Sequence, residues 1–184
     1  MATFEDRSNT ALLVVDVQVD VMGEAYEREA TLGRIATLVD SARAAGTPVI
    51  WVQHSDQELK RETPGWEIVP ELKPRASEAV VHKNYGDSFE ATDLESVLDA
   101  AGVGHLVVAG AESDACIRST IHGAFTRGYD VTLVGDAHTA GDRSAWGAPP
   151  PEAVIAHMNL YWQFQGAPER TAAVVKTDDL VFGR

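Results

Sequence analysis

The sequence contains only one cysteine, Cys116, among its 184 residues. A single thiol cannot close an internal disulfide, so a disulfide-stabilised scaffold is excluded. The N-terminal stretch MATFEDRSNT lacks the basic start and the apolar run of a secretory signal. No segment approaches the about 20 apolar residues of a membrane span. We therefore expect a cytoplasmic protein with a reduced thiol and no membrane partner.

Positive charge is scarce as well. The chain has 15 lysines and arginines against 28 aspartates and glutamates, which gives a formal net charge of -13. No basic cluster reverses this balance locally, so nucleic acid is not an expected partner. A negative field favours a cationic small-molecule substrate, although a negative surface more often serves solubility.

Motifs for nucleotide binding, for dinucleotide binding and for a serine-hydrolase nucleophile are also missing. The chain has no G-x-x-x-x-G-K-[ST] motif and no G-x-S-x-G motif, and its closely spaced glycines in GVGHLVVAG precede a predicted strand instead of following one. We therefore expect no nucleotide cofactor. The length fits a single domain over residues 1–184 that buries its own core.

Short apolar runs alternate with amphipathic stretches along the chain. Continuous apolar runs are typical of strands that are covered on both faces, as in parallel sheets. Apolar positions spaced three and four apart predict helices. Predicted strands cover residues 11–16, 48–53, 79–82, 105–110 and 130–137, and residues 171–180 are expected to add a sixth strand and a short helical turn. Predicted helices cover residues 30–45, 92–102, the stretch after Cys116, and 148–164.

This alternation predicts an α/β fold. We expect a three-layer α/β/α sandwich around a six-stranded, mainly parallel, Rossmann-like sheet. Residues 54–73 have no clear period and contain Pro64, Gly65 and Pro70, so they are expected to form a long loop, which is often functional.

Three reactive side chains follow predicted strands. Asp16 ends the first, Lys83 follows the third, and Cys116 lies just beyond the fourth. Each has an ordinary structural explanation as a turn cap, a solvated lysine or a small buried side chain. Ligands of open α/β sheets bind beyond the carboxyl ends of the strands, however. The three residues together therefore predict a catalytic site.

The surroundings of Cys116 strengthen this prediction. Ser113 or Asp114 is a good helix N-cap, which would place Cys116 in the first helical turn. The helix dipole and a nearby ammonium would stabilise a thiolate there and lower its pKa. The unpaired N–H groups of the first turn could hold an oxyanion beside the thiol.

At these three places the sequence resembles the isochorismatase-like cysteine hydrolases. The resemblance rests on Asp16 in LLVVDVQ, Lys83 in VVHKNYGDSFEATDLESVL and Cys116 in VVAGAESDACIRST, and it extends over about residues 10–140. Three motifs in the same order are a specific signal. Homologues commonly assemble, so the resemblance also implies a homodimer or a homotetramer.

The resemblance implies a mechanism as well. Asp16 would accept the thiol proton, Lys83 would stabilise the thiolate, and Cys116 would attack an amide, carbamoyl, ureido or cyclic amide carbonyl. The backbone N–H groups of Glu112 and Cys116 would form the oxyanion hole. A cis peptide bond between Ala111 and Glu112 is also expected from the resemblance.

Two features depart from the family pattern. Nicotinamidases of the family resemble one another in a D-x-H metal site followed by further histidines, whereas here His54 precedes Asp56 and no second histidine follows in the loop. We therefore expect no metal. Glu112 stands where the family more often has a small or neutral residue. If Glu112 faces the pocket, it would favour a cationic substrate, and it could instead point to solvent.

Four aromatic residues are candidates for the substrate pocket together with Glu112. Tyr26, Trp66, Tyr85 and Phe89 all fall in predicted loops or strand ends. Core packing or subunit contact is the alternative explanation, and for Phe89 it is the better one.

Two other functions remain open at this point. An isochorismatase acting on a vinyl ether would need an acid such as Asp16 but no thiol nucleophile. A non-catalytic binding or redox-sensing protein would carry Cys116 as an exposed, oxidisable thiol. The presence of Asp16 and Lys83 weighs against the second, because a sensor needs neither as a proton carrier.

Overall fold

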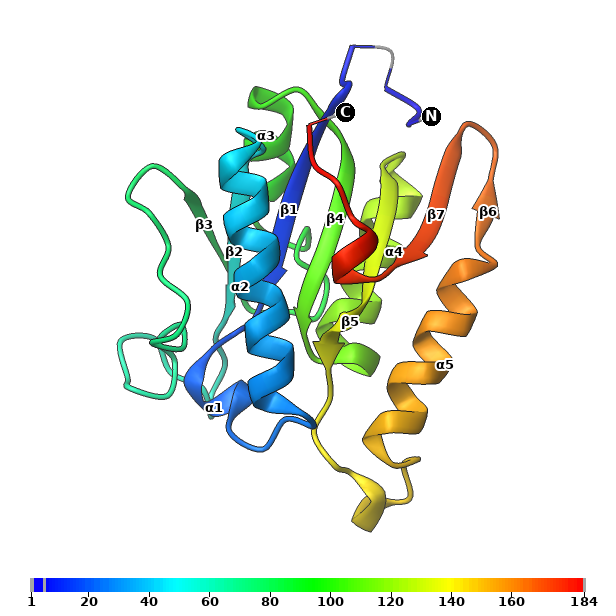
Figure 1. Cartoon of the computed structure of the whole chain (residues 1–184). Helices are drawn as coiled ribbons and strands as arrows, with labels where there is room; N and C mark the ends of the chain where they lie inside the picture. The colour runs from blue at the N-terminus through cyan, green and yellow to red at the C-terminus, as the bar shows by residue number, and fades with distance from the viewer. Residues whose placement is uncertain (1, 5, 184) are drawn as a thin grey trace.

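The computed structural model describes residues 2–4 and 6–183. It is an α/β structure in which helices cover both faces of one sheet (Figure 1). The strands are β1 (Asn9–Val15), β2 (Val49–His54), β3 (Ala79–Lys83), β4 (Val103–Ala111), β5 (Asp130–Thr139), β6 (Gly166–Ala167) and β7 (Arg170–Val175). The α-helices are α1 (Val19–Met22), α2 (Arg28–Ala44), α3 (Leu94–Ala100), α4 (Arg118–Arg127) and α5 (Pro151–Gln163).

The sheet has seven strands in the order β3-β2-β1-β4-β5-β7-β6. The first six strands in this order run parallel to one another, which confirms the predicted parallel architecture. The predicted count of six strands is one short. The additional strand, β6, runs antiparallel to β7 at the edge of the sheet. Two residues are too few to produce a recognisable hydrophobic pattern.

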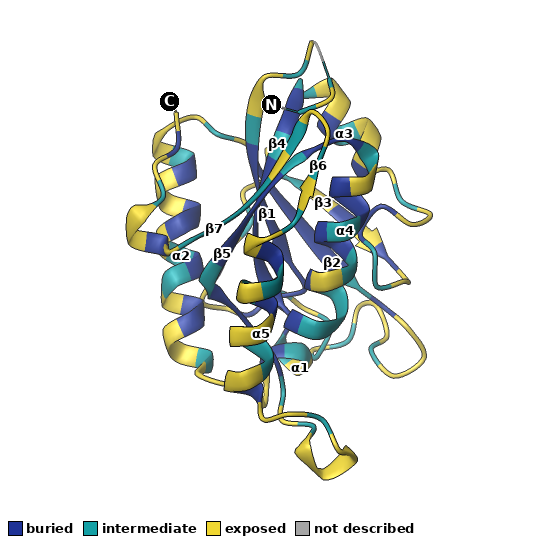
Figure 2. Ribbon diagram, turned by 90° about the vertical axis from the view of Figure 1, so that its right-hand side faces the viewer, coloured by how far each residue is buried: buried dark blue, intermediate teal, exposed yellow. Residues whose placement is uncertain are grey.

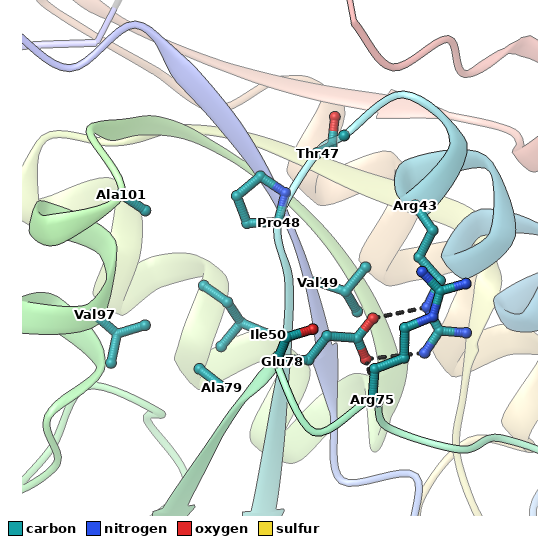
Figure 3. Close-up of a pocket in the computed structure, with 12 residues that line it drawn as sticks. Arg43, Thr47, Pro48, Val49, Ile50, Arg75, Glu78, Ala79, Val97 and Ala101 are labelled. Carbon is teal, nitrogen blue, oxygen red and sulfur yellow. Dashed lines mark hydrogen bonds and ion pairs between the residues drawn. The ribbon is translucent and has the colours of Figure 1, made fainter.

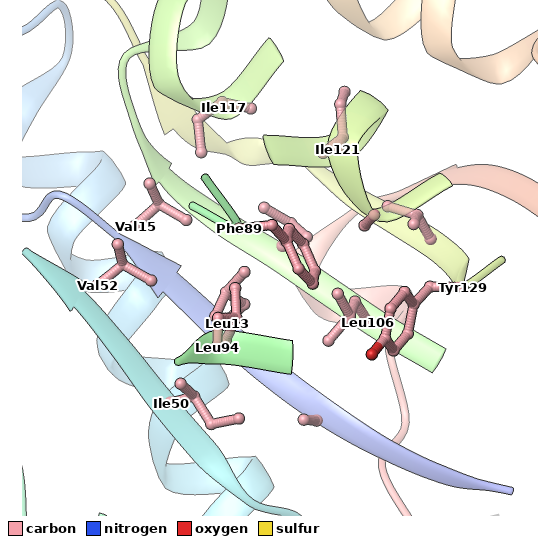
Figure 4. Packing of buried hydrophobic residues seen from close by; sticks show 14 of the residues in the cluster. Leu13, Val15, Ile50, Val52, Phe89, Leu94, Leu106, Ile117, Ile121 and Tyr129 are labelled. Carbon is pink, nitrogen blue, oxygen red and sulfur yellow. The ribbon is translucent and has the colours of Figure 1, made fainter. Parts of the chain in front are cut away.

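The two faces of the sheet bury separate sets of side chains. Along β1, Leu13 and Val15 point to one face, while Leu12 and Val14 point to the other. The first face packs against α3, α4 and α5 (Figure 4). The second packs against α2, which lies on the opposite side of the sheet from α3 and α4 in Figure 2. β1 is therefore covered on both sides, as its unbroken apolar run predicted.

Helix α2 shows how local sequence sets an element's limits. The predicted apolar stripe of α2, which includes Leu32, Ile35 and Val39, is buried against the sheet. The helix starts two residues before the predicted boundary and ends just before Gly46. Gly46 has a φ of 71°, a left-handed conformation that glycine adopts without a steric penalty.

The segment from residue 55 to residue 78, between β2 and β3, contains no helix or strand, in agreement with the predicted loop. It is nevertheless tied to the chain that leaves β1. The amide of Asp20 donates to the carbonyl of Gly65 at 2.9 Å, and the amide of Val69 donates to that of Val17 at 3.0 Å. These bonds hold the loop beside α1, at the lower left of Figure 1, where the carboxyl ends of β1 and β2 lie.

None of the helices in the described part of the chain combines the length and the apolar character that crossing a bilayer requires.

Candidate active site

The three predicted catalytic residues meet at the carboxyl edge of the sheet. Asp16 directly follows β1, Lys83 ends β3, and Cys116 follows β4. The Nζ atom of Lys83 lies 2.7 Å from Oδ2 of Asp16 and donates to Sγ of Cys116 at 3.2 Å. The structure therefore brings together residues that are far apart in the sequence, because parallel strands end at one edge.

The backbone at this edge has an uncommon local geometry. Asp16 has a φ of 51°, in the left-handed region that aspartate tolerates better than most residues. Next to it, Gly110 of β4 has a φ of 126°, and a Cβ atom built there would lie 2.0 Å from the carbonyl oxygen of Val15. Only glycine allows β4 to approach β1 so closely, just before the chain turns toward Cys116.

Cys116 lies in a π-helical turn, Ser113–Ile117, that continues into α4. The amide of Ile117 donates to the carbonyl of Glu112 at 3.0 Å, five residues back. Such wide turns are rare in proteins, and many of those that occur lie at functional sites. The peptide bond between Ala111 and Glu112, just before the turn, is cis.

The predicted side-chain cap of this helix is wrong. The residue in the N-cap position is Glu112, and it makes no capping bond. The hydroxyl of Ser113 instead forms a hydrogen bond with Nδ1 of His138 at 2.8 Å. The long-range partner on β5 competes for the Ser113 hydroxyl, and that partner could not be read from the local sequence.

The site is nearly closed to solvent. Asp16 and Lys83 are each 1% exposed, and Cys116 is partly buried. Burial raises the pKa of Asp16, although the charge of Lys83 and contact with Cys116 act in the opposite direction. A carboxylate with a raised pKa is a stronger base than one in water.

The predicted lowering of the Cys116 pKa is wrong. Burial and the negative charge of Asp16 together raise the pKa of Cys116 to about 12, and Lys83 offsets only part of this effect. The resting site therefore holds a neutral thiol beside a basic carboxylate and an ammonium. This arrangement suits transfer of the thiol proton to Asp16 while sulfur attacks a carbonyl carbon.

Lys83 has two further partners that the sequence did not reveal. Its Nζ atom donates to the carbonyl oxygen of Tyr85 at 3.1 Å and lies 3.3 Å from Nδ1 of His54. The Nε2 atom of His54 in turn lies 3.1 Å from Oδ2 of Asp56. The position of His54 at the end of β2 was the available signal, because that strand ends at the same edge.

A cavity of about 460 Å³ adjoins the triad through His54. It is lined by Asp20, Val21, His54, Asp56, Glu58, Leu59, Glu112 and Arg143. Four of these side chains are acidic. Among the residues that the structure describes, no group of three or more histidine, cysteine, aspartate or glutamate side chains is arranged to hold a metal ion.

Glu112 lines this cavity instead of pointing away from it. Its Oε2 atom forms an ion pair with Nη2 of Arg143, and its Oε1 atom accepts a hydrogen bond from the amide of Gly141 at 3.3 Å. Arg143 also lies 3.6 Å from Oδ1 of Asp114. The charge that Glu112 brings to the cavity is therefore compensated within the chain.

The four predicted aromatic residues occupy other positions, and within the described ranges none of them lines this cavity. Phe89 lies in the core, 7% exposed, with its ring 5.6 Å from that of Tyr129 (Figure 4). Tyr26 lines a separate groove between α2 and α5. The ring of Trp66 packs 5.4 Å from that of His82.

Tyr85 contributes its backbone carbonyl to Lys83, while 57% of the residue is exposed. The described wall of the cavity is therefore formed by charged side chains together with Val21, Leu59 and His54, and not by the four predicted aromatic residues. A place in a predicted loop does not by itself show which way an aromatic side chain points.

Known proteins share this fold and this sequence pattern. The model of the isochorismatase domain matches residues 10–159. The chain is 38% identical over 138 residues to a streptothricin hydrolase of Streptomyces noursei, covering 72% of this chain and 50% of that protein. It is 30% identical over 172 residues to a ureidoacrylate amidohydrolase of Variovorax paradoxus, covering 71% of this chain and 68% of that protein.

A solved structure agrees with these matches. The crystal structure of an isochorismatase from Pseudomonas putida has a TM-score of 0.82 and 26% sequence identity, and the match covers 94% of this chain and 90% of that one. The chain spans about half the length of the streptothricin hydrolase it matches.

Proposed function

The chain belongs to the isochorismatase family, and we propose that it is a cysteine amidohydrolase that cleaves a C–N bond of a small molecule. The observation that carries this proposal is the contact of Lys83 with both Asp16 and Cys116 at the carboxyl edge of the sheet. It places a base, a cation and a nucleophile within reach of one reacting atom.

The reaction proceeds in two halves. Asp16 accepts the proton of the Cys116 thiol as sulfur bonds to the carbonyl carbon of an amide, carbamoyl, ureido or cyclic amide group. The N–H groups of Glu112 and Cys116 stabilise the tetrahedral oxyanion. Asp16 then gives its proton to the leaving nitrogen as the C–N bond breaks. Water, deprotonated by Asp16, cleaves the resulting thioester and restores the thiol.

The lining of the cavity supports a cationic substrate. Asp20, Asp56 and Glu58 contribute carboxylates to it, and the one arginine there, Arg143, is paired with Glu112. The unbalanced negative charge attracts a cation more than an anion. The names of the two relatives add streptothricin and ureidoacrylate as compounds to test first.

Assembly into a homodimer or a homotetramer belongs to the same proposal. Trp146 is 82% exposed and Phe164 is 77% exposed. Large exposed apolar side chains are frequent at contacts between subunits. A cytoplasmic location fits as well, because the chemistry needs a reduced thiol.

The test is a hydrolysis screen of paired amides that differ only in carrying an ammonium or a carboxylate group, with streptothricin, ureidoacrylate and isochorismate included. The parent protein should release amine or ammonia from a cationic amide, and Cys116→Ala should lose turnover by at least about a thousandfold. Turnover of isochorismate that survives Cys116→Ala would contradict the proposal and favour vinyl-ether hydrolysis. Absence of any turnover would favour a binding protein.

A further inference from the structure

We infer that His54, oriented by Asp56, is a positioning residue that holds the Lys83 ammonium in place for the reaction. The inference rests on the proposed function, since it concerns the same triad. His54 ends β2, lines the cavity and touches Lys83.

Lys83 has a full set of hydrogen-bond partners. Its Nζ atom lies 3.1 Å from the carbonyl oxygen of Tyr85, 3.2 Å from Cys116 Sγ and 3.3 Å from His54 Nδ1. An ammonium group has three hydrogens, so these three partners use all of them. Oδ2 of Asp16 lies 2.7 Å away as an ion-pair partner, without the alignment of a hydrogen bond. His54 is therefore one of the three contacts that set the direction in which the ammonium points.

This contact determines the protonation pattern of the His54 ring. The Lys83 ammonium has no lone pair, so Nδ1 of His54 must accept. In the neutral ring the hydrogen then lies on Nε2, which donates to Oδ2 of Asp56 at 3.1 Å. The partner carboxylate thus selects one tautomer and one ring orientation, as carboxylates commonly do for functional histidines.

Asp56 is itself held in place. Its Oδ1 atom accepts hydrogen bonds from the amides of Glu58 and Leu59, both at 2.8 Å. These backbone bonds lower the pKa of Asp56 and keep it an anion. A fixed anion is a suitable partner for the Nε2 hydrogen of His54.

The backbone of His54 is fixed by a buried glutamine. Gln18 is 0% exposed, and its Oε1 atom accepts from the amide of His54 at 2.8 Å. The Nε2 atom of Gln18 donates to the carbonyl of His54 at 3.0 Å. The main chain and the ring of His54 are therefore both restrained, which is what a positioning residue requires.

The contact with His54 limits where the Lys83 ammonium can move. A neutral thiol is a weak acceptor, so in the resting site the bonds to His54 and to the Tyr85 carbonyl hold the ammonium more firmly than the bond to sulfur. As negative charge develops on sulfur, the hydrogen that already points to Cys116 forms a stronger, charge-assisted bond. Because imidazole is neutral, His54 holds the ammonium within reach without neutralising its charge. Without His54, the Tyr85 carbonyl and the ion pair with Asp16 would hold the ammonium, and its contact with sulfur would lengthen.

Three substitutions separate this role from a merely structural one. The Oδ1 atom of an asparagine at position 54 can replace Nδ1 of His54 as the acceptor for Lys83. The longer side chain of a glutamine places its amide where Nε2 of His54 lies, beyond that contact. His54→Ala and His54→Gln should lower kcat by about 10- to 100-fold with KM changed less than about threefold, as expected for loss of an orienting contact. His54→Asn should remain within about fivefold of the parent, because the acceptor for Lys83 is kept.

A second readout needs no substrate. The rate of Cys116 alkylation by iodoacetamide at a fixed alkaline pH should fall in His54→Ala and His54→Gln and be kept in His54→Asn, since Lys83 stabilises the thiolate. Thermal melts of all three variants check folding. An equal loss of kcat and of alkylation rate in His54→Asn and His54→Gln would overturn the inference. A change in KM alone would overturn it as well.

The same readout distinguishes failure of this inference from failure of the proposed function. If alkylation of the parent is indifferent to Lys83→Met and Asp16→Asn, the triad itself is not a reactive unit and the proposed function fails. If alkylation responds to those two substitutions but not to His54→Ala, only the positioning role of His54 fails.

Discussion

Two ion pairs with little solvent exposure lie at opposite edges of the sheet, and the pKa values of their carboxylates are shifted in opposite directions. Asp16 and Lys83 pair at the carboxyl edge, within the triad. Glu78 and Arg43 pair at the amino edge, beside the first residues of β2 and β3 (Figure 3). Each pair joins a carboxylate to a cation at 2.7 Å.

The pairs differ in the number of donors around the carboxylate. Glu78 accepts from two nitrogens of Arg43 at 2.7 and 2.9 Å, from Nε1 of Trp51 at 2.8 Å and from the amide of Arg75 at 2.9 Å. Within the described part of the chain, neither oxygen of Asp16 has a well-oriented hydrogen-bond partner. Asp16 depends on the charge of Lys83.

The pKa values reflect this difference. Burial raises the pKa of Glu78, but the bonds from Arg43, Arg75 and Trp51 outweigh it and lower the pKa to about 2. For Asp16, burial dominates and raises the pKa. A carboxylate with all its donors stabilises the fold, whereas one short of donors costs stability and remains available as a base.

The largest expected effect is on catalysis at the carboxyl edge. The double variant Asp16→Asn/Lys83→Met should lose at least about a thousandfold in kcat/KM, because the base and the cation are both removed. Its free energy of unfolding should match that of the parent or exceed it by about 1–4 kcal/mol, since replacing a buried pair as a whole removes two desolvated charges. Urea unfolding and amide hydrolysis measure the two quantities. A double variant that is strongly destabilised would remove the contrast between the edges.

The reverse result is expected at the amino edge. Glu78→Gln should lower the free energy of unfolding by about 2–3 kcal/mol, in line with the lowered pKa of Glu78. The kcat value should stay within about twofold, because the site lies at the other edge. Glu67→Gln, an exposed change in the same loop, serves as the control. A variant of Glu78 that loses activity while keeping its stability would contradict this division.

The pH dependence of the same variant sharpens the contrast. The pKa of Glu78 falls from 4.5 to about 2 on folding, so its contribution is fully present above the higher value and is lost as pH falls through the lower one. The difference in unfolding free energy between the parent and Glu78→Gln should therefore be constant near neutral pH and shrink between about pH 4.5 and pH 2. A difference that persists at pH 2 would point to lost packing, not lost charge.

The smallest effect is expected at the rim of the cavity. Glu112→Gln removes the partner of Arg143 and leaves the arginine's positive charge in the cavity. The ratio of kcat/KM for a cationic amide to that for its anionic analogue should fall by about fivefold, as the pair is partly exposed. Arg143→Gln should raise this ratio, because it removes the positive charge and leaves that of Glu112. Equal ratios in both variants would show that the rim does not select charge.

Local sequence was enough to predict most of the fold. The apolar runs of β1 and β4 and the stripe of α2 follow from their own residues. The meeting of Asp16, Lys83 and Cys116 could be predicted because each lies at or just beyond the end of a strand, and the topology of a parallel sheet brings such positions together.

What could not be predicted depends on partners distant in the sequence. The pairing of Glu112 with Arg143 and the contact of His54 with Lys83 join different loops and strand ends. The sign of the Cys116 pKa shift was missed for the same reason. The helix position and Lys83 favoured a thiolate, but the depth of burial and the nearness of Asp16 appear only in three dimensions.

The most direct test compares two reactions of Cys116 in the Asp16→Asn variant. In the proposed mechanism Asp16 is the base that accepts the thiol proton during attack, and its negative charge also keeps the resting thiol neutral. Removing that charge should speed alkylation by iodoacetamide near neutral pH and reduce amide hydrolysis by at least about a thousandfold. Alkylation and hydrolysis that fall together would mean that Asp16 ionises the thiol before substrate arrives, and would contradict the proposed mechanism.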